Sequence, residues 1–141
     1  MQAYRTILVG TDFTALGEIA VRAACSVASR LGAERLHIAH IVGAATGNMM
    51  TTGVAGVPFA ENVLEPMFQR ALADAQRALD SIPLPEVTAK VTKEVRVGIP
   101  ARELRKMADE VNADLIVIST HRRGKVARLV LGSVADALIR L

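Results

Sequence analysis

The side chains best suited to hold an anion gather between residues 119 and 134. Four cations stand close together in this segment: Arg122, Arg123, Lys125 and Arg128. Gly132-Ser133 follows, where a helical pattern begins. A helix start offers unpaired backbone N–H groups and a partial positive charge, and glycine lets a phosphate approach them closely. The segment therefore predicts phosphate binding, with the alternative that Ser133 only caps the helix.

A second polar group follows the first apolar run of the chain. Thr6 to Gly10 reads as a buried strand, and Gly10, Thr11 and Asp12 end it. In parallel α/β sheets, ligands bind beyond the carboxyl ends of the strands. Asp12 is therefore a candidate hydrogen-bond acceptor for a ligand, and its alternative role is to cap the next helix or hold the turn.

The sequence contains no recognisable catalytic constellation. There is no GxSxG elbow, HExxH pair or P-loop. Asp12 is a single carboxylate, which is not enough to hold a two-metal centre. His37 and His40 fall in an apolar strand and are expected to be core residues with backbone partners, whereas His121 could meet a phosphate when protonated. The basic cluster is short and lacks interleaved aromatic residues, so specific nucleic-acid binding is not expected.

Strands and helices alternate along the whole chain. Such an order predicts a parallel sheet with right-handed crossovers, an α/β fold. Expected strands are residues 6–10, 36–42, 87–97 and 114–119, and expected helices are 15–31, 65–81, one after Gly98-Ile99-Pro100 and one from about Ser133. A long Gly-, Thr- and Met-rich loop is expected at 43–58.

Hydrophobic periodicity also predicts how these elements are buried. In the first helix, the stripe expected to face the core is Leu16, Ile19, Ala20, Ala23, Val27 and Leu31, with Cys25 on the opposite side. Pro66 suits a first helical turn. The alternation over 87–97 predicts a half-covered edge strand, and the continuous apolar run over 114–119 predicts a central one.

Composition limits the class of protein. The 141 residues suit one domain, 1–141, and 51% of them are hydrophobic, enough for a substantial aliphatic core. The net charge of +3 favours anionic partners without identifying one. With Cys25 as the single cysteine, no apolar run of membrane-spanning length and no signal-peptide pattern, a cytoplasmic location is expected.

The chain resembles the universal stress protein family over nearly its whole length. The family's nucleotide motif is Gly, two residues, Gly, nine residues, then Gly-Ser or Gly-Thr. Other similar segments are Ile7 to Asp12, Leu36 to Val42, and Gly98-Ile99-Pro100. The matching motif positions are Ser119, Arg122, Gly132 and Ser133, flanked by Thr120-His121, Leu131 and Val134-Ala135.

The resemblance implies a three-layer, Rossmann-like fold of the adenine nucleotide alpha hydrolase-like type, with strand order 3-2-1-4. It implies an adenine nucleotide (ATP, ADP or AMP) whose adenosine lies between Gly10-Thr11-Asp12 and Ile41. The phosphates would lie on Thr120, Gly132 and Ser133, beside Ser119 and Val134, with Arg122 or Arg123 as charge partner. Magnesium could accompany the nucleotide through its phosphates. The implied role is a stress-response sensor or adaptor, usually a homodimer, with at most slow hydrolysis.

Two departures from the family pattern keep an alternative open. Ser119 and Arg122 replace both leading glycines of the motif, and family members without the motif are thought not to bind ATP. The sequence stops at Leu141, before the fifth strand that often pairs two subunits, so either the sequence is trimmed or the sheet has four strands. The alternative is therefore an oligomerising interaction module of the same family that binds no nucleotide.

Overall fold

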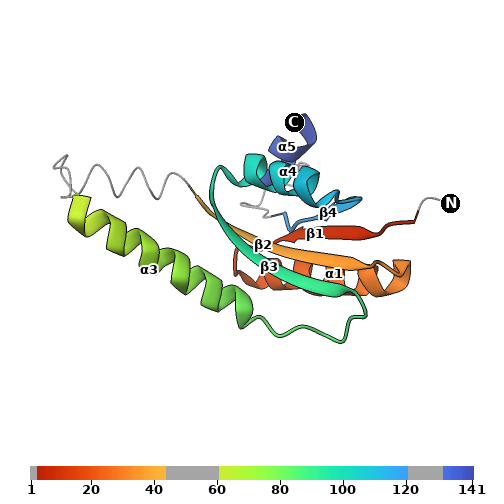
Figure 1. The fold of residues 1–141 in the computed structure, drawn as a ribbon. Coiled ribbons are helices and arrows are strands. Elements are labelled where there is room, and N and C mark those ends of the chain that lie inside the picture. Colours follow the sequence, from red (N-terminus) through yellow and green to blue (C-terminus); the bar gives the residue numbers. More distant parts are fainter. Residues whose placement is uncertain (1–2, 44–60, 121–131) are drawn as a thin grey trace, which may run out of the picture.

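A computed structural model describes residues 3–43, 61–120 and 132–141 of the chain. The predicted loop at 43–58 lies almost wholly outside these residues, as do His121 and the four clustered cations. Figure 1 shows a twisted sheet between two helical layers, with α1 (Ala15–Leu31) and α3 (Glu61–Asp80) on one face and α4 (Pro100–Val111) and α5 (Ser133–Arg140) on the other.

The sheet has four parallel strands in the order β3-β2-β1-β4, as the resemblance implied. They are β1 (Thr6–Gly10), β2 (Arg35–Gly43), β3 (Lys90–Gly98) and β4 (Leu115–Val117). Both the α/β class and the strand order are confirmed. The predicted edge position of the third strand is also confirmed, because β3 pairs only with β2 among the described strands.

The prediction of a central fourth strand is wrong. Strand β4 has three residues, pairs with β1 alone among the described strands, and leaves its side chains half-buried. Its continuous apolar run arises because helices pack against both faces near it: Leu115 and Val117 lie on the α1 side, and Ile116 lies on the α4 side.

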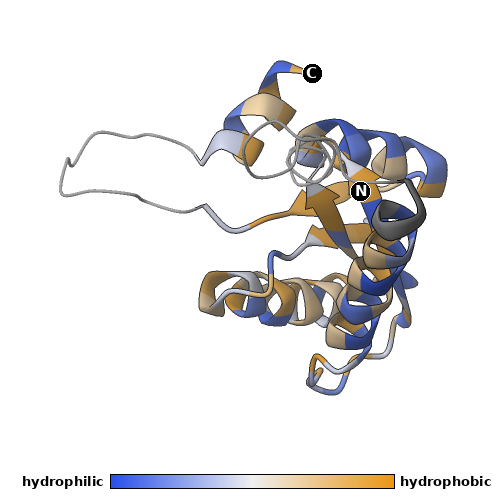
Figure 2. Ribbon diagram, turned by 90° about the vertical axis from the view of Figure 1, so that its left-hand side faces the viewer, coloured by the Kyte–Doolittle hydropathy of each residue, from blue (hydrophilic) through white to orange (hydrophobic). Residues whose placement is uncertain are grey.

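The core forms two layers, one on each side of the sheet, and Figure 2 shows the hydrophobic strands between them. Successive residues of β1 alternate between the layers: Ile7 and Val9 face α1, and Leu8 faces α4. All three side chains have no exposed surface. Strand β1 is therefore the rigid centre from which the following loop is positioned.

Helix α1 has the predicted bounds but a different buried face. The helix begins after the N-cap Thr14 and ends at Gly32, whose φ of 64° suits glycine. Leu16, Ile19 and Leu31 are 39%, 55% and 43% exposed. The buried face consists of small and medium side chains, of which only Ala20 belongs to the predicted stripe: Gly17, Ala20, Val21, Ala24, Cys25 and Ala28. Small residues allow the helix to approach the sheet closely, so the periodic stripe of larger residues lies to the side.

Cys25 was expected opposite the core, and this expectation is wrong as well. The residue is 1% exposed and packs among the core residues on the α1 side of the sheet. Burial raises the pKa of its thiol above the usual value, against a smaller lowering by a backbone hydrogen bond. The side chain therefore behaves as a small apolar core group.

The second predicted helix is also longer than expected. Helix α3 begins at Glu61, so Pro66 lies inside the helix and not in its first turn. Leu79, near the end of the helix, is fully buried against the α1 side of the core, whereas Met67 is 47% exposed.

Candidate functional site

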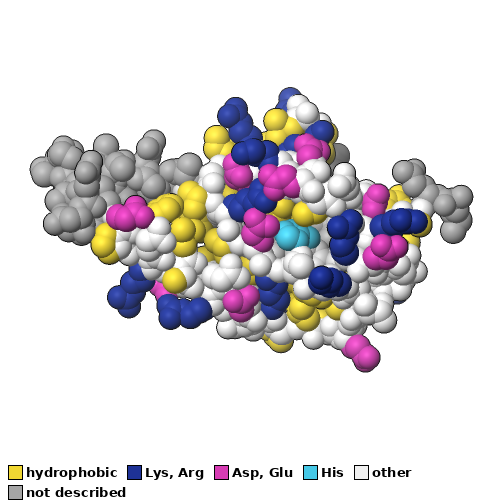
Figure 3. Space-filling model, in the orientation of Figure 1, with side chains coloured by type: hydrophobic (Ala, Val, Ile, Leu, Met, Phe, Trp, Pro, Cys, Tyr) yellow, Lys and Arg dark blue, Asp and Glu magenta, His cyan; other side chains and the backbone are white. Residues whose placement is uncertain are grey.

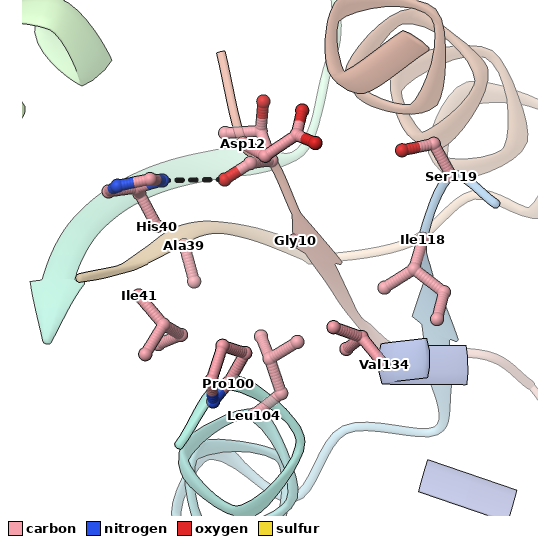
Figure 4. Close-up of a pocket in the computed structure, with 11 residues that line it drawn as sticks. Gly10, Asp12, Ala39, His40, Ile41, Pro100, Leu104, Ile118, Ser119 and Val134 are labelled. Atoms are coloured by element: carbon pink, nitrogen blue, oxygen red, sulfur yellow. Dashed lines mark hydrogen bonds between the residues drawn. The ribbon is translucent and has the colours of Figure 1, made fainter. Parts of the chain in front are cut away.

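A cavity of about 140 Å³ opens at the carboxyl ends of β1, β2 and β4. Figure 4 shows its lining: apolar side chains from β2, α4 and α5 and from Ile118 after β4, with polar groups at one side. The lining residues are Gly10, Thr11, Asp12, Ala39, His40, Ile41, Pro100, Leu104, Ile118, Ser119 and Val134. This is where ligands bind in open α/β sheets. Its volume is close to the roughly 150 Å³ of an apolar cavity that holds one benzene ring.

Gly10 keeps the floor of the cavity open. A Cβ at this position would lie 3.2 Å from Leu104 Cδ1 and 3.4 Å from Ile118 Cγ2, and both side chains line the cavity. Any larger residue at the end of β1 would therefore fill the space or push these walls apart.

The loop between β1 and α1 forms the polar side of the cavity. Thr11 is buried and its backbone N–H donates to the Ala39 carbonyl over 2.9 Å, which ties the loop to β2. The N–H of Thr14 donates to Asp12 Oδ1 over 3.0 Å, and the Thr14 hydroxyl donates to the same oxygen. Thr14, not Asp12, caps α1, because its hydroxyl accepts from Gly17 N. Asp12 thus holds the turn while lining the cavity.

His40 also lines the cavity, and the sequence patterns did not mark it as a site residue. Its Nδ1 donates to the Thr11 carbonyl over 2.8 Å, which confirms the expected backbone partner. The ring lies against Phe13, with centroids 4.1 Å apart. Its position one residue before Ile41, at the end of a strand beside β1, was the signal that could have identified it.

The expected phosphate-binding residues fall into two groups. Ser119 and Val134 line the cavity, and Gly132 and Ser133 directly precede Val134 at the start of α5. Thr120 is exposed and does not line the cavity, and Arg122 and Arg123 lie outside the described residues. The alternative that Ser133 caps α5 is wrong, because Gly132 is the N-cap and no side chain caps this helix start.

A separate charged network lies on the same sheet face as Ala39 and Ile41, towards the β3 edge. Figure 3 shows acidic and basic side chains beside a histidine between α4 and β3. Arg96 bridges Glu94 and Glu110, and Glu94 accepts from His37 Nε2 over 3.0 Å. His37 Nδ1 is hydrogen-bonded to the Thr92 hydroxyl. The partners of His37 are therefore side chains, not the expected backbone groups. No member of this network lines the cavity.

These contacts change the acidity of the carboxyl groups in the network. Partial burial acts to raise the pKa of Glu94, but hydrogen bonds from Arg96 and His37 outweigh it and hold that pKa below its usual value. The hydrogen bond from Arg96 likewise lowers the pKa of Glu110. The pKa of Arg96 is raised in turn, first by Glu110 and then by Glu94. Glu94 and Glu110 therefore remain ionised at neutral pH, each paired with Arg96.

Within residues 3–43, 61–120 and 132–141, no three His, Cys, Asp or Glu side chains are arranged to hold a metal ion. None of the described helices has both the length and the apolar character needed to cross a membrane.

Comparison with known proteins identifies the family. The profile of the universal stress protein family matches residues 3–141. Universal stress protein MJ0577 from Methanocaldococcus jannaschii is 28% identical over 145 residues, covering 97% of this chain and 89% of that protein. The solved structure of hypothetical protein MJ0577 has a TM-score of 0.67 at 23% identity, covering 99% of this chain and 90% of that one.

A second solved structure, a universal stress protein in complex with cAMP, has a TM-score of 0.55 at 26% identity and covers 99% of this chain and 91% of its own. The family profile, the relative and the two structures thus agree over almost the whole chain. This chain belongs to the universal stress protein family.

Proposed function

We propose that the chain binds an adenine nucleotide in the cavity and acts as a stress-response sensor or adaptor. The observation that carries the proposal is the convergence of Asp12, Ile41 and Val134 on one cavity from three separate elements. The cAMP complex of a structurally similar universal stress protein supports the same ligand class. One domain over residues 1–141, a cytoplasmic location and a homo-oligomeric state belong to this proposal.

The chemistry of the lining supports a proposed position for each part of the nucleotide. Its apolar walls suit a planar base, which packs against Ile41 and Leu104. The Asp12 carboxylate at the polar side accepts hydrogen bonds from ribose hydroxyls or from the base amino group.

The phosphates are assigned to the start of α5. Gly132 and Ser133 begin this helix without a side-chain cap, so its first N–H groups and its dipole suit an anion. Thr120, with Arg122 or Arg123, completes the proposed phosphate contacts, and magnesium would be held mainly by the phosphates themselves.

Isothermal titration calorimetry with ATP, ADP, AMP and cAMP tests the proposal. Asp12→Asn should weaken binding roughly tenfold or more, because a hydrogen bond to a charged group contributes about 1.5–3 kcal/mol. Asp109→Asn is the matched control: this carboxylate is exposed near the end of α4 and does not line the cavity, so its loss should leave the Kd unchanged. Equal effects of the two variants would contradict the assignment of Asp12.

The Arg122→Gly variant separates the proposal from its alternative. It restores a glycine of the family motif at a position where this chain carries a guanidinium. If the native protein binds no nucleotide and only this variant does, the chain is better described as an oligomerising interaction module. If the native protein binds and the variant changes the affinity only modestly, the nucleotide proposal stands.

A further inference from the structure

The Asp12 loop contains a strained residue that needs external support. Phe13 has a φ of 63°, in the left-handed region that is unfavourable for a residue with a bulky side chain. The loop makes its own hydrogen bonds around this residue: Phe13 N donates to Thr11 Oγ1 over 3.3 Å, and Thr14 N donates to Asp12 Oδ1. Neither bond reaches beyond the loop, whose backbone bond to the sheet is the one from Thr11 N to Ala39 O, before the strained residue.

His40 of β2 provides contacts on both sides of Asp12. Its Nδ1 is 2.8 Å from the Thr11 carbonyl, the residue before Asp12. Its ring packs on Phe13, the residue after Asp12, at an interplanar angle of 31°. A carbonyl oxygen only accepts, so Nδ1 carries the proton in this contact. Figure 4 shows this bond as a dashed line beside Asp12.

We propose that His40 is a positioning residue that holds Asp12 at the wall of the cavity. It does so by anchoring the Thr11 carbonyl and by packing on Phe13 in its left-handed conformation. The role of Asp12 towards a ligand rests on the proposed function, but the mechanical claim concerns the loop itself and can be measured without ligand.

Three variants separate the N–H donor from the bulk of the side chain. His40→Leu keeps an apolar group but removes the donor. His40→Asn places an amide N–H near the position of Nδ1 and so retains the donor. His37→Leu is the matched control: His37 lies on the same strand but on the other sheet face, and its partners are Thr92 and Glu94.

Amide hydrogen exchange, measured by NMR on the unliganded protein, reports how often the loop opens. In His40→Leu, exchange at Phe13 and Thr14 should become roughly threefold to tenfold faster, the change expected for the loss of one net hydrogen bond. The Ala33 and Asp114 amides, which donate to Ala28 O and Thr6 O, should keep their native rates. His40→Asn should restore most of the loop protection, and His37→Leu should leave the loop unchanged.

ATP titration of the same variants adds the functional readout. The Kd of His40→Leu should rise by a similar roughly threefold to tenfold factor, with His40→Asn recovering most of the loss. Faster exchange at the control amides as well, or native loop exchange in His40→Leu, would overturn the positioning role. A native protein that binds no nucleotide would instead overturn the proposed function, while the exchange rates would still decide the role of His40.

Discussion

Replacing Gly17 with alanine should weaken nucleotide binding while the chain stays folded. Gly17 is a buried residue in the first turn of α1. A Cβ there would stand 2.7 Å from both Asp12 Oδ1 and Thr11 Oγ1, and 3.1 Å from Asp12 N. The first two separations are too short for real carbon contacts, so the Asp12 carboxylate and the Thr11 hydroxyl, or the segment that carries them, have to move away from the helix.

Two effects of the substitution on the free energy of unfolding oppose each other: a gain in helix propensity and the strain on two loop hydrogen bonds. Alanine gains about 1 kcal/mol over glycine in a helix. Displacing the loop strains two hydrogen bonds, Thr14 N to Asp12 Oδ1 and Phe13 N to Thr11 Oγ1, which contribute about 0.5–1.5 kcal/mol each. The net loss of stability is therefore about 0–2 kcal/mol. A displaced Asp12 carboxylate forfeits a charged hydrogen bond to the ligand, which corresponds to a Kd roughly tenfold or more higher.

Urea unfolding and ATP calorimetry on the same preparations measure the two quantities separately. Gly32→Ala is the control, because Gly32 has a φ of 64° and open space around its Cβ position. A side chain in that conformation costs roughly 1–2 kcal/mol of stability, but the residue lies at the far end of α1 from the cavity. Gly17→Ala with native affinity, or Gly32→Ala with an equal loss of affinity, would refute the reasoning.

Three further outcomes are expected. Leu8→Ala should lower the free energy of unfolding in urea by about 2–5 kcal/mol, because Leu8 is fully buried on the α4 side of the sheet; a loss below about 1 kcal/mol would contradict this packing. The pKa of Glu94 is lower in the folded state than its usual value, so its contribution to stability is present at neutral pH and is lost as the pH falls through the folded pKa; acid titration of Glu94→Gln should show a shallower loss than the native protein. Cys25 should react with a thiol reagent only as fast as the protein opens, so rapid labelling of the native state would exclude its burial.

The order of elements could be predicted because it depends on local signals. A short apolar run ending in Gly10 and an alternating apolar–polar run ending at Gly98 marked strands, and Gly32 marked the end of a helix. The buried face of α1 could not be predicted in the same way. Two apolar stripes run along that helix, and the choice between them depends on how closely it approaches the sheet, a tertiary property. The edge position of β4 also depends on long-range pairing, which its own residues do not encode.

The candidate site likewise contains residues that the sequence could predict and residues that it could not. Asp12 and Ser119 were found because they follow strands whose carboxyl ends meet in a parallel sheet. Pro100, Leu104 and Ile118 were missed as site residues, because apolar residues that line a cavity have the same patterns as those that fill a core. Arg122 and Arg123 remain predictions, since they lie outside the described residues.

The two edges of the described sheet differ in how they would receive an additional strand. The β3 edge carries Lys93, Glu94 and Arg96, which are charged groups of the kind that discourages pairing between chains. Strand β4 offers only Leu115, Ile116 and Val117, with no charge among them. Any lengthening of the sheet, by another segment or another subunit, is therefore favoured at β4, and growth at both ends into an open-ended fibre is disfavoured.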